Sequence, residues 1–342
     1  MTIDLTFELS RPDAAGVSCQ LFQPRLIPRL RAALRLRRYS LRTEKAYVQW
    51  VRRYILFHGK RHPQDMGAVE VTAFLNHLAN ARHVAAATQN QALAGLLFLY
   101  REVLEVDLPW LDGLIRAKTA KRLPTVLTRN EVPTILSQLA GTSWLMVSLL
   151  YGAGLRLNEC LSLRVKDVDL NGSKLIVREG KGNKDRVTLL PSSLQAPLLA
   201  HLERVKALHD ADLAQGFGEA PMPLALAGKY PKAGYLWAWQ FLFPSTQHCR
   251  DPYTGRTVRF HVHEKTLQRA VKEAARRAGI GKPVGCHTFR HAFATHLLEA
   301  GQNIRVVQEL MGHKDVATTM IYTHVMNTSL AAVRSPADCL PK

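Results

Sequence analysis

Six side chains in the second half of the chain have types that suit chemistry on a phosphodiester. Their order along the sequence is Arg156, Lys181, His287, Arg290, His313 and Tyr322. A guanidinium group is permanently charged and can bind two oxygens at once, which an ammonium group cannot do. Arg156 and Arg290 therefore suit the non-bridging oxygens of a phosphate, where negative charge builds as the bond breaks. His287 and His313 can donate to the phosphate or move a proton near neutral pH.

Tyr322 is the candidate nucleophile, and its attack on phosphorus would give a covalent 3′-phosphotyrosine and a 5′-hydroxyl. The pKa of a phenol in water is about 10, and we expect a cationic pocket to favour the phenolate. Lys181 lies between Gly180 and Gly182 and suits a general acid that protonates the departing 5′-oxygen. Because the bond energy stays in the phosphotyrosine, we expect ligation without ATP. We also expect no metal and no other cofactor.

Each of these residues has an ordinary structural interpretation when it is taken alone. A single Arg or Lys is usually a surface charge, and Tyr322 in an apolar helix would usually be core. His287 and His291, four residues apart, could ligate a metal, but the sequence has no H-E-x-x-H motif and no nearby carboxylate cluster. Cys286 could supply a thiol nucleophile instead. The joint occurrence of the six types, in this order, favours phosphodiester chemistry.

The composition indicates a globular protein that binds a polyanion. The 342 residues are enough for two domains, and the net charge of +19 favours a nucleic acid as partner. Residues 25–124 hold 18 Lys and Arg against 7 Asp and Glu, and residues 125–342 hold 27 against 17. We therefore expect both segments to contact the polyanion. A solvated charged surface is the alternative, and binding that weakens steeply with salt would exclude it.

The compartment is predicted from what the sequence lacks. No apolar run reaches the ~18–20 residues that span a bilayer. The first residues have no basic stretch ahead of an apolar one, so no secretory signal is predicted. The five cysteines are scattered and form no C-x-x-C pair, which is typical of reduced thiols. We expect a cytoplasmic protein with no membrane contact.

The first part of the chain is predicted to be helical. Residues 1–24 show no periodicity and are expected to form a flexible arm. Residues 25–112 carry apolar stretches at helical spacing, which predicts about four helices, with Ser40 as a helix cap. These stretches cover 30–34, 47–55, 71–78 and 93–100.

A basic linker is predicted at residues 113–124. It contains Lys118, Lys121 and Arg122, which we expect to cross a DNA backbone between two domains. An ordinary solvated linker would have a similar composition.

Residues 125–342 are expected to form a second domain that mixes helices with a little sheet. Thr128 and Glu131 form a predicted capping box at the start of a helix over 128–139. Residues 174–178 and 186–190 alternate as the strands of a β-hairpin with Lys181 at its tip. Further helices are predicted over 144–150, 193–209, 264–278, 289–300 and 303–311, followed by one that carries Tyr322.

From about residue 29 to 336 the sequence resembles the tyrosine recombinases, whose six active-site positions match the residues named above. The resemblance implies a mainly α fold with a small antiparallel β-sheet, in which a helical core-binding domain and an α+β catalytic domain form a clamp around DNA. It also implies a homotetramer on synapsed DNA, with strands exchanged in pairs through a Holliday junction. Glu159 matches a position where the family usually has a supporting acidic residue.

A narrower resemblance is to the integron integrases, and it is carried by an inserted segment at about 217–262. This segment contains Ala227-Gly228-Lys229-Tyr230-Pro231, Trp237-Ala238-Trp239 and Leu242-Phe243-Pro244-Ser245. Two other stretches match as well, at 40–47 and at 333–336 in the C-terminal tail, about 328–342. Integron integrases integrate and excise gene cassettes at folded single-stranded hairpin sites and at a double-stranded insertion site.

The resemblance assigns DNA contacts within the inserted segment. Trp239 would stack on one extrahelical base, and Pro252 and His261 would contact another. Many integron integrases have adjacent histidines where this chain has Phe260 and His261, so Phe260 could stack but one polar contact is in question. Trp237, Trp239, Phe241 and Phe243 alternate, however, and a strand with a buried aromatic face would also explain them.

Three other functions remain open from the sequence. A generic recombinase of duplex sites would share the active site, and so would a type IB topoisomerase acting as a monomer. The third is a DNA-binding protein with vestigial catalytic residues. The complete set of six residues and the integron-type insertion favour a gene-cassette recombinase in the bacterial cytoplasm, associated with the nucleoid.

Overall fold

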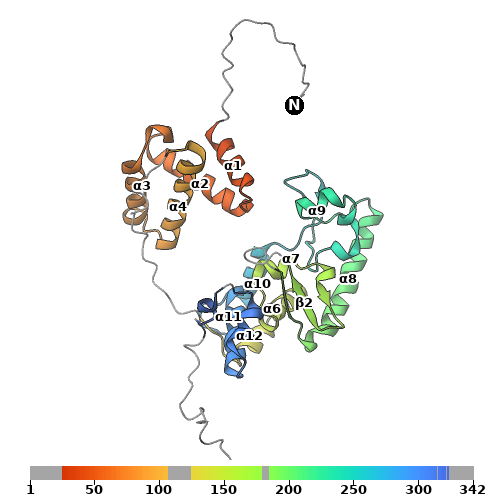
Figure 1. Cartoon of the computed structure of the whole chain (residues 1–342). Coiled ribbons are helices and arrows are strands. Elements are labelled where there is room, and N and C mark those ends of the chain that lie inside the picture. Colours follow the sequence, from red (N-terminus) through yellow and green to blue (C-terminus); the bar gives the residue numbers. More distant parts are fainter. Residues whose placement is uncertain (1–24, 107–124, 179–184, 314, 321, 323–342) are drawn as a thin grey trace, which may run out of the picture. The chain divides into compact units, whose positions relative to one another are not determined.

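A computed structural model describes residues 25–106, 125–178, 185–313, 315–320 and 322 (Figure 1). The chain divides into two compact units, Met1–Lys121 and Arg122–Lys342. The described residues are mainly helical with small antiparallel sheets, so the predicted fold class is confirmed. The expected arm at 1–24, the linker at 113–124 and the tail at 328–342 lie outside the described residues.

Helices make up the described part of the first unit. The four predicted helices are present as α1 Leu26–Leu36, α2 Leu41–Phe57, α3 Ala68–Asn80 and α4 Ala86–Leu99, with short turns η1 Pro63–Asp65 and η2 Tyr100–Leu104. Ser40 caps α2 as predicted, because its side chain accepts a hydrogen bond from the Thr43 N–H. Tyr54 of α2 and Tyr100 of η2 are buried in the core and share a 2.9 Å hydrogen bond between their hydroxyls.

The second unit begins with short helices and a three-stranded sheet. Its first elements are α5 Glu131–Leu136, α6 Gly141–Gly152, α7 Leu157–Ser162, η4 Val165–Asp167, β1 Val168–Asp169, β2 Lys174–Val177 and β3 Arg186–Leu189. The strands are antiparallel in the order β1-β2-β3. The two strands of the predicted hairpin are therefore confirmed, and its tip at 179–184 lies outside the described residues. The predicted capping box is present, although its helix spans only α5.

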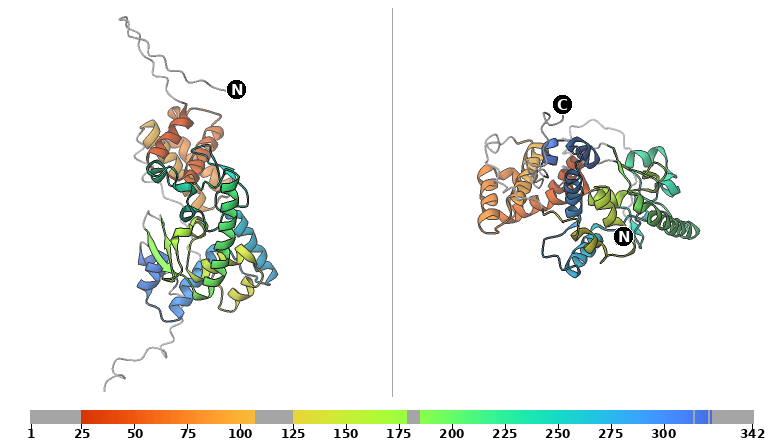
Figure 2. Two further views of the ribbon diagram at one scale, coloured as in Figure 1. Left: turned by 90° about the vertical axis from the view of Figure 1, so that its right-hand side faces the viewer. Right: turned by 90° about the horizontal axis from the view of Figure 1, so that it is seen from below.

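The chain then runs through the inserted segment to the C-terminal helices. These elements are η5 Ser192–Leu194, α8 Gln195–Ala214, α9 Leu224–Lys229, η6 Ala233–Tyr235, η7 Trp237–Trp239, β4 Cys249–Arg250, β5 Thr257–Val258, α10 Glu264–Arg277, α11 Cys286–Glu299, α12 Ile304–Met311 and α13 Val316–Met320. In Figure 1, α8 and α9 lie at one edge of this unit and α11 and α12 at the opposite edge, with β2 between them. Figure 2 shows α8, in green, from two further sides.

The core of the second unit is built on α6 and α11. The side chains of α6 from Leu145 to Leu150 are all buried, so every face of this helix is covered. This is expected of a helix in the centre of a domain. Gly154 lies in the turn after α6 at φ +63°, and a Cβ there would lie 2.4 Å from the ring of Phe293 on α11. Only glycine allows this turn to approach α11 so closely, and the turn leads directly to Arg156.

Two predicted helix boundaries are wrong in ways that affect the site. The helix α11 starts at Cys286 rather than 289, so His287 lies in its first turn. Tyr322 is not in a helix, because α13 ends at Met320. The Tyr322 N–H bonds to the Thr319 carbonyl at 3.1 Å, three residues back. This is the bond of a tightened turn, which ends a helix rather than extends it.

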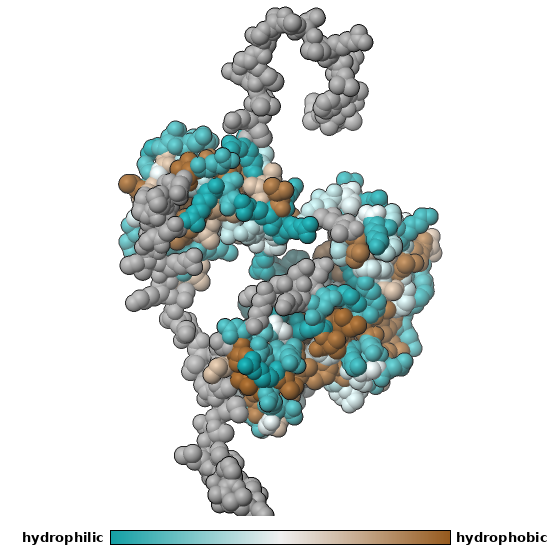
Figure 3. Space-filling view, viewed as in Figure 1, coloured by the Kyte–Doolittle hydropathy of each residue, from teal (hydrophilic) through white to brown (hydrophobic). Residues whose placement is uncertain are grey.

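No helix among the described residues is long and apolar enough to cross a bilayer. On the face drawn in Figure 3, hydrophilic side chains are widespread on both units, and each also shows apolar patches.

Candidate active site

Arg156 is held at the start of α7 by Glu159. Its backbone N–H donates to the Glu159 carboxylate at 2.8 Å, and its guanidinium donates to the same group at 2.6 Å. A second guanidinium N–H reaches the Gly312 carbonyl at 3.4 Å. The spacing of three residues, a capping box in α7, therefore fixes the direction in which Arg156 points. Glu159 supports Arg156, as the sequence had suggested for an acidic residue here.

Glu159 is also bound by Arg186 of β3, a residue that sequence analysis did not single out. Both oxygens of Glu159 accept hydrogen bonds from Arg186, at 2.9 and 2.7 Å. Arg186 also donates to the Leu310 carbonyl at 2.9 Å, which ties β3 to α12. The carboxylate is buried, yet these guanidinium groups hold its pKa at about 2. Arg186 follows a stretch of sequence rich in Gly and Lys, and no local pattern there indicates this contact.

Arg290 is the most deeply buried charged residue near the site, with 1% of its surface exposed. Its guanidinium donates to the Gly154 carbonyl, to the Met311 carbonyl at 2.5 Å and to His313 Nε2 at 3.2 Å. Burial and the charge of Arg156 lower the pKa of Arg290 to about 9, so it stays charged at neutral pH. Arg290 thus joins the turn before Arg156 to the end of α12.

His313 directly follows Gly312, the left-handed residue that ends α12. Its Nε2 accepts from Arg290, and its Nδ1 lies 2.9 Å from the Thr319 hydroxyl. Burial, followed by the charges of Arg290, Arg156 and Arg186, lowers the pKa of His313 to about 3. The imidazole is therefore neutral at pH 7, and its ring stacks on that of Tyr322 at 6.4 Å between centroids.

Tyr322 is buried in the same pocket, with 3% of its surface exposed. Arg290 and Arg156 lower the pKa of its hydroxyl, as the sequence predicted, but burial is the larger effect and the net direction is upward. The expected preference for phenolate is therefore wrong for this state, because desolvation of the anion outweighs two nearby cations. Attack on phosphorus requires a group that accepts the phenolic proton.

Two histidines lie on one face of α11, and the second of them contacts Tyr322. His287 is exposed in the first turn, and its ring centroid lies 4.3 Å from that of His291, one turn later. His291 Nδ1 lies 2.8 Å from the Tyr322 hydroxyl. The sequence already shows that His287 and His291 are four residues apart, but this spacing suggested only a metal site. Within the described residues, no group of three or more His, Cys, Asp or Glu side chains could hold a metal ion.

The structure thus brings five of the six predicted catalytic residues into one pocket: Arg156, His287, Arg290, His313 and Tyr322. Arg156, Arg186 and Arg290 face the single carboxylate of Glu159, so positive charge remains in excess for a phosphate. Cys286 is an unsuitable nucleophile, because burial raises the pKa of its thiol to about 11. Four other predicted site residues lie outside the described residues: Lys118, Lys121, Arg122 and Lys181.

The aromatic residues of the inserted segment separate into a buried group and a half-exposed one. Phe241 and Phe243 are core residues, as the structural alternative predicted, but Trp237 and Trp239 lie in the helical turn η7 rather than in a strand. Trp237 stacks on His209. Trp239 is half-exposed, with the Lys166 ammonium 2.8 Å and the Arg164 guanidinium carbon 5.4 Å from its ring centroid. Trp239 therefore presents an aromatic face among cations.

The other predicted contacts of this segment lie nearby or on a loop. The rings of Phe260 and His261 both pack on Phe241, at 5.4 and 5.2 Å, and Phe260 stays 40% exposed. Arg164 also covers Phe241, at 4.5 Å, so it lies between this cluster and Trp239. Pro252 is exposed between β4 and β5.

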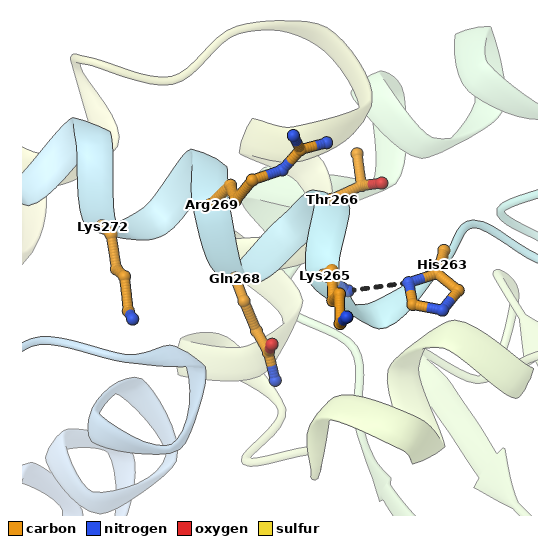
Figure 4. A pocket seen from close by; sticks show the side chains of 6 residues that line it. All are labelled: His263, Lys265, Thr266, Gln268, Arg269 and Lys272. Atoms are coloured by element: carbon orange, nitrogen blue, oxygen red, sulfur yellow. Dashed lines mark hydrogen bonds between the residues drawn. The ribbon is translucent and has the colours of Figure 1, made fainter.

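A basic concavity follows α10 (Figure 4). It has a volume of about 450 Å³ and is lined by His263, Lys265, Thr266, Gln268, Arg269 and Lys272. Figure 4 shows Lys265, Gln268 and Lys272 on one side of the helix. Within the part of the chain that the structure describes, Lys265, Arg269 and Lys272 form no ion pair. Unpaired cations along a helix suit a phosphate backbone.

Comparison with known proteins decides the family. Residues 125–328 match the phage integrase family, and residues 26–110 match its N-terminal SAM-like domain. The tyrosine recombinase XerD of Agrobacterium fabrum is 35% identical over 280 residues, which cover 76% of this chain and 77% of the relative. The chain belongs to the phage integrase family of tyrosine recombinases. It is therefore a DNA strand transferase of site-specific recombination.

Other relatives of the recombinase cover nearly its whole length. An integrase/recombinase of Escherichia coli is 51% identical over 317 residues, or 93% of this chain and 94% of the relative. Among solved structures, a lambda integrase dimer bound to a COC′ core site aligns with a TM-score of 0.60 at 17% identity, covering 90% of this chain and 98% of that one. A XerH recombinase bound to difH substrate aligns with a TM-score of 0.57 at 20% identity, covering 87% and 80%. These structural likenesses show the shared fold.

The depressed pKa of Glu159 predicts that the recombinase loses stability in acid. A carboxyl group whose pKa falls from 4.5 to about 2 on folding stabilises the folded state above pH 4.5, by about 3 kcal/mol. That contribution is lost as pH falls from 4.5 through 2. We expect Glu159→Gln to lower the free energy of unfolding at pH 7 by this amount and to flatten its dependence below pH 4.5, measured by urea unfolding. The exposed Glu273→Gln is the control, and an equal effect there would contradict the role of Glu159.

Proposed function

We propose that the recombinase cleaves one strand at a time through Tyr322, forming a 3′-phosphotyrosine while Arg156 and Arg290 bind the phosphate. The observation that best supports this is the Tyr322 hydroxyl buried within the influence of both guanidinium groups. His287 and His313 would donate to the phosphate oxygens, and Lys181 would protonate the departing 5′-oxygen. The phosphotyrosine conserves the bond energy, so religation would need no nucleotide, and we propose that the arginines and histidines take the place of a metal at the phosphate.

We propose further that the helical unit acts as a core-binding domain and the second unit as the catalytic domain of a clamp. Lys118, Lys121 and Arg122 would cross the DNA backbone in the linker. The unpaired cations of α10 support a second set of phosphate contacts. Four protomers would synapse two sites in the bacterial cytoplasm, on the nucleoid, and exchange strands through a Holliday junction.

The substrates that we infer are gene-cassette sites folded as single-stranded hairpins, together with a double-stranded insertion site. Support comes from Trp239, a half-exposed aromatic ring that lies beside Arg164 and Lys166, because proteins that bind single strands combine aromatic side chains with a basic groove. Phe260 and His261 lie across Arg164 from it and would contact a second extruded base with Pro252. A base that leaves the helix exposes its faces, so structure rather than sequence would be read.

The proposed activity is tested with a nicked suicide substrate and with two marked sites. A covalent complex on the suicide substrate is expected of a recombinase and of a type IB topoisomerase alike. Exchange between two marked sites, a folded cassette strand and a duplex insertion site, is expected only of the recombinase. Relaxation of supercoils without exchange would overturn the proposal in favour of the topoisomerase.

Trp239→Ala is expected to weaken binding to a folded cassette site more than binding to a duplex site. Loss of one base–aromatic stack costs about 1–3 kcal/mol, or roughly 5- to 150-fold in Kd, and the duplex offers no extruded base. Gel-shift titrations of both sites measure the two constants.

The matched control is Trp239→Phe, which keeps an aromatic face and should lose much less affinity. A folded site whose extruded bases are deleted should bind wild type and Trp239→Ala alike. Equal weakening on folded and duplex sites would show that Trp239 reads no extruded base.

A further inference from the structure

The hydroxyl of Tyr322 is in contact with a histidine outside the six matched positions. His291 lies on α11 directly after Arg290 and one turn after His287, and its Nδ1 is 2.8 Å from the Tyr322 Oη. The two ring centroids are 5.3 Å apart. This hydrogen bond joins the oxygen that would attack phosphorus to a side chain that can carry a proton.

The protonation states allow the phenol to donate in that hydrogen bond. Burial, then the charges of His287 and Arg290, lowers the pKa of His291 to about 4, so its imidazole is neutral at pH 7. Burial raises the pKa of Tyr322, so the phenol keeps its proton. A neutral imidazole has one nitrogen that accepts. In the tautomer that carries its ring proton on Nε2, Nδ1 is that acceptor and the phenol donates to it.

The other groups around the hydroxyl are unsuited to accept this proton. Arg156 and Arg290 are guanidinium groups, which have no acceptor. His313 already accepts from Arg290 at Nε2 and contacts Thr319 at Nδ1, and its ring lies parallel to that of Tyr322 at 6.4 Å. Among the described residues, His287 contacts His291 by its ring and makes no hydrogen bond to Tyr322. His291 is left as the acceptor in contact.

We propose that His291 is the general base that takes the phenolic proton when Tyr322 attacks the scissile phosphorus. This rests on the proposed role of Tyr322 as nucleophile. In the step, the Oη–H bond breaks and its proton passes to Nδ1, while the Oη–P bond forms and the bond from phosphorus to the 5′-oxygen breaks. The departing oxygen takes a different proton, from Lys181. Religation runs in reverse, and imidazolium returns the proton to the phenolate oxygen as it leaves.

The same geometry explains how a base with a low pKa can serve here. Burial is the main cause of the depressed pKa of His291, and repulsion from the charge of Arg290 adds to it, so an imidazolium is unfavourable in the empty pocket. A bound phosphate brings negative charge to the two arginines and so relieves that repulsion. Proton transfer is thereby coupled to the presence of DNA, and Tyr322 stays protonated without it.

The test is single-turnover cleavage of a nicked suicide substrate by wild type, His291→Ala, His291→Gln and Tyr322→Phe. We expect both His291 variants to cleave about 10²- to 10⁴-fold more slowly, the usual contribution of a general base, with DNA affinity unchanged. Glutamine can accept a hydrogen bond from the phenol but cannot take its proton. A wild-type rate in His291→Gln would overturn the proposal and leave His291 as a residue that only positions Tyr322.

Two further measurements separate a base from a structural role. A substrate with sulfur in place of the departing 5′-oxygen needs no general acid, so it should restore Lys181→Ala but not His291→Ala. Added imidazole should accelerate His291→Ala and leave Tyr322→Phe inactive. Recovery of His291→Ala by the sulfur substrate, or failure of imidazole to accelerate it while the variant unfolds at the wild-type temperature, would overturn the assignment. An adduct that persists in Tyr322→Phe would instead refute the proposed nucleophile.

Discussion

Tyr322→Phe is expected to abolish the covalent protein–DNA complex on a suicide substrate while DNA affinity stays within about twofold of wild type. The substitution removes the one oxygen that can attack phosphorus. It keeps the ring, which stacks on His313 at 6.4 Å and belongs to the small core that α11 and α12 form around Phe293 and Met311. Denaturing gels report the complex, and gel-shift titrations report affinity.

The folded state should tolerate this change well. Tyr322 loses a single hydrogen bond, to His291, which is worth about 1 kcal/mol. A covalent complex that still forms in the variant would place the nucleophile on another residue. Loss of DNA binding together with cleavage would mean that the variant tests folding rather than chemistry.

Arg290→Ala is expected to slow single-turnover cleavage by at least about 10²- to 10³-fold, by comparison with the loss of a donor to a developing oxyanion. Its effect on the fold should also be measurable. Arg290 is almost wholly buried, and its guanidinium donates to the carbonyls of Gly154 and Met311. Removing this side chain leaves two buried acceptors unpaired. Glu159 keeps Arg156 and Arg186 as partners, so the pocket loses one cation without leaving a carboxylate unpaired.

Two comparisons separate the chemical loss from the structural one. Arg290→Lys keeps the charge, but an ammonium cannot match the fork that bonds both carbonyls, so cleavage should remain low. Arg305→Ala removes the same charge from an exposed position on α12 and should cleave like wild type. Thermal unfolding of all three reports the structural part. Normal cleavage by Arg290→Ala would exclude it from transition-state binding.

The sequence alone predicted the chemistry of the pocket because that chemistry resides in side-chain types. Arginine is cationic and bidentate wherever it is placed, and His287 precedes Arg290 by three residues in any conformation. The helical periodicities were also local properties, so α2, α8, α10 and α12 agree with the predicted ranges to within a few residues. The strands flanking Lys181 followed from the alternation of apolar residues.

Where the prediction failed, the deciding contact joined residues far apart in sequence. Arg186 is 27 residues from Glu159 and pairs with it only because β3 passes beside the start of α7. The alternation of aromatic residues from Trp237 to Phe243 suggested a strand, but Trp237 and Trp239 lie in a helical turn. There Trp237 stacks on His209, and Trp239 makes a cation–π contact with Lys166. No local pattern contains these partners.

The sequence by itself determined which residue types could act on a phosphate and the elements that carry most of them. Only the tertiary structure decided their protonation and their partners. Burial raised the pKa of Tyr322 despite two nearby cations and lowered that of His313, and the packing of the chain brought His291 against the phenol. The physical reason is that desolvation and hydrogen bonding depend on the three-dimensional surroundings of a group, whereas charge and helical spacing are written in the chain.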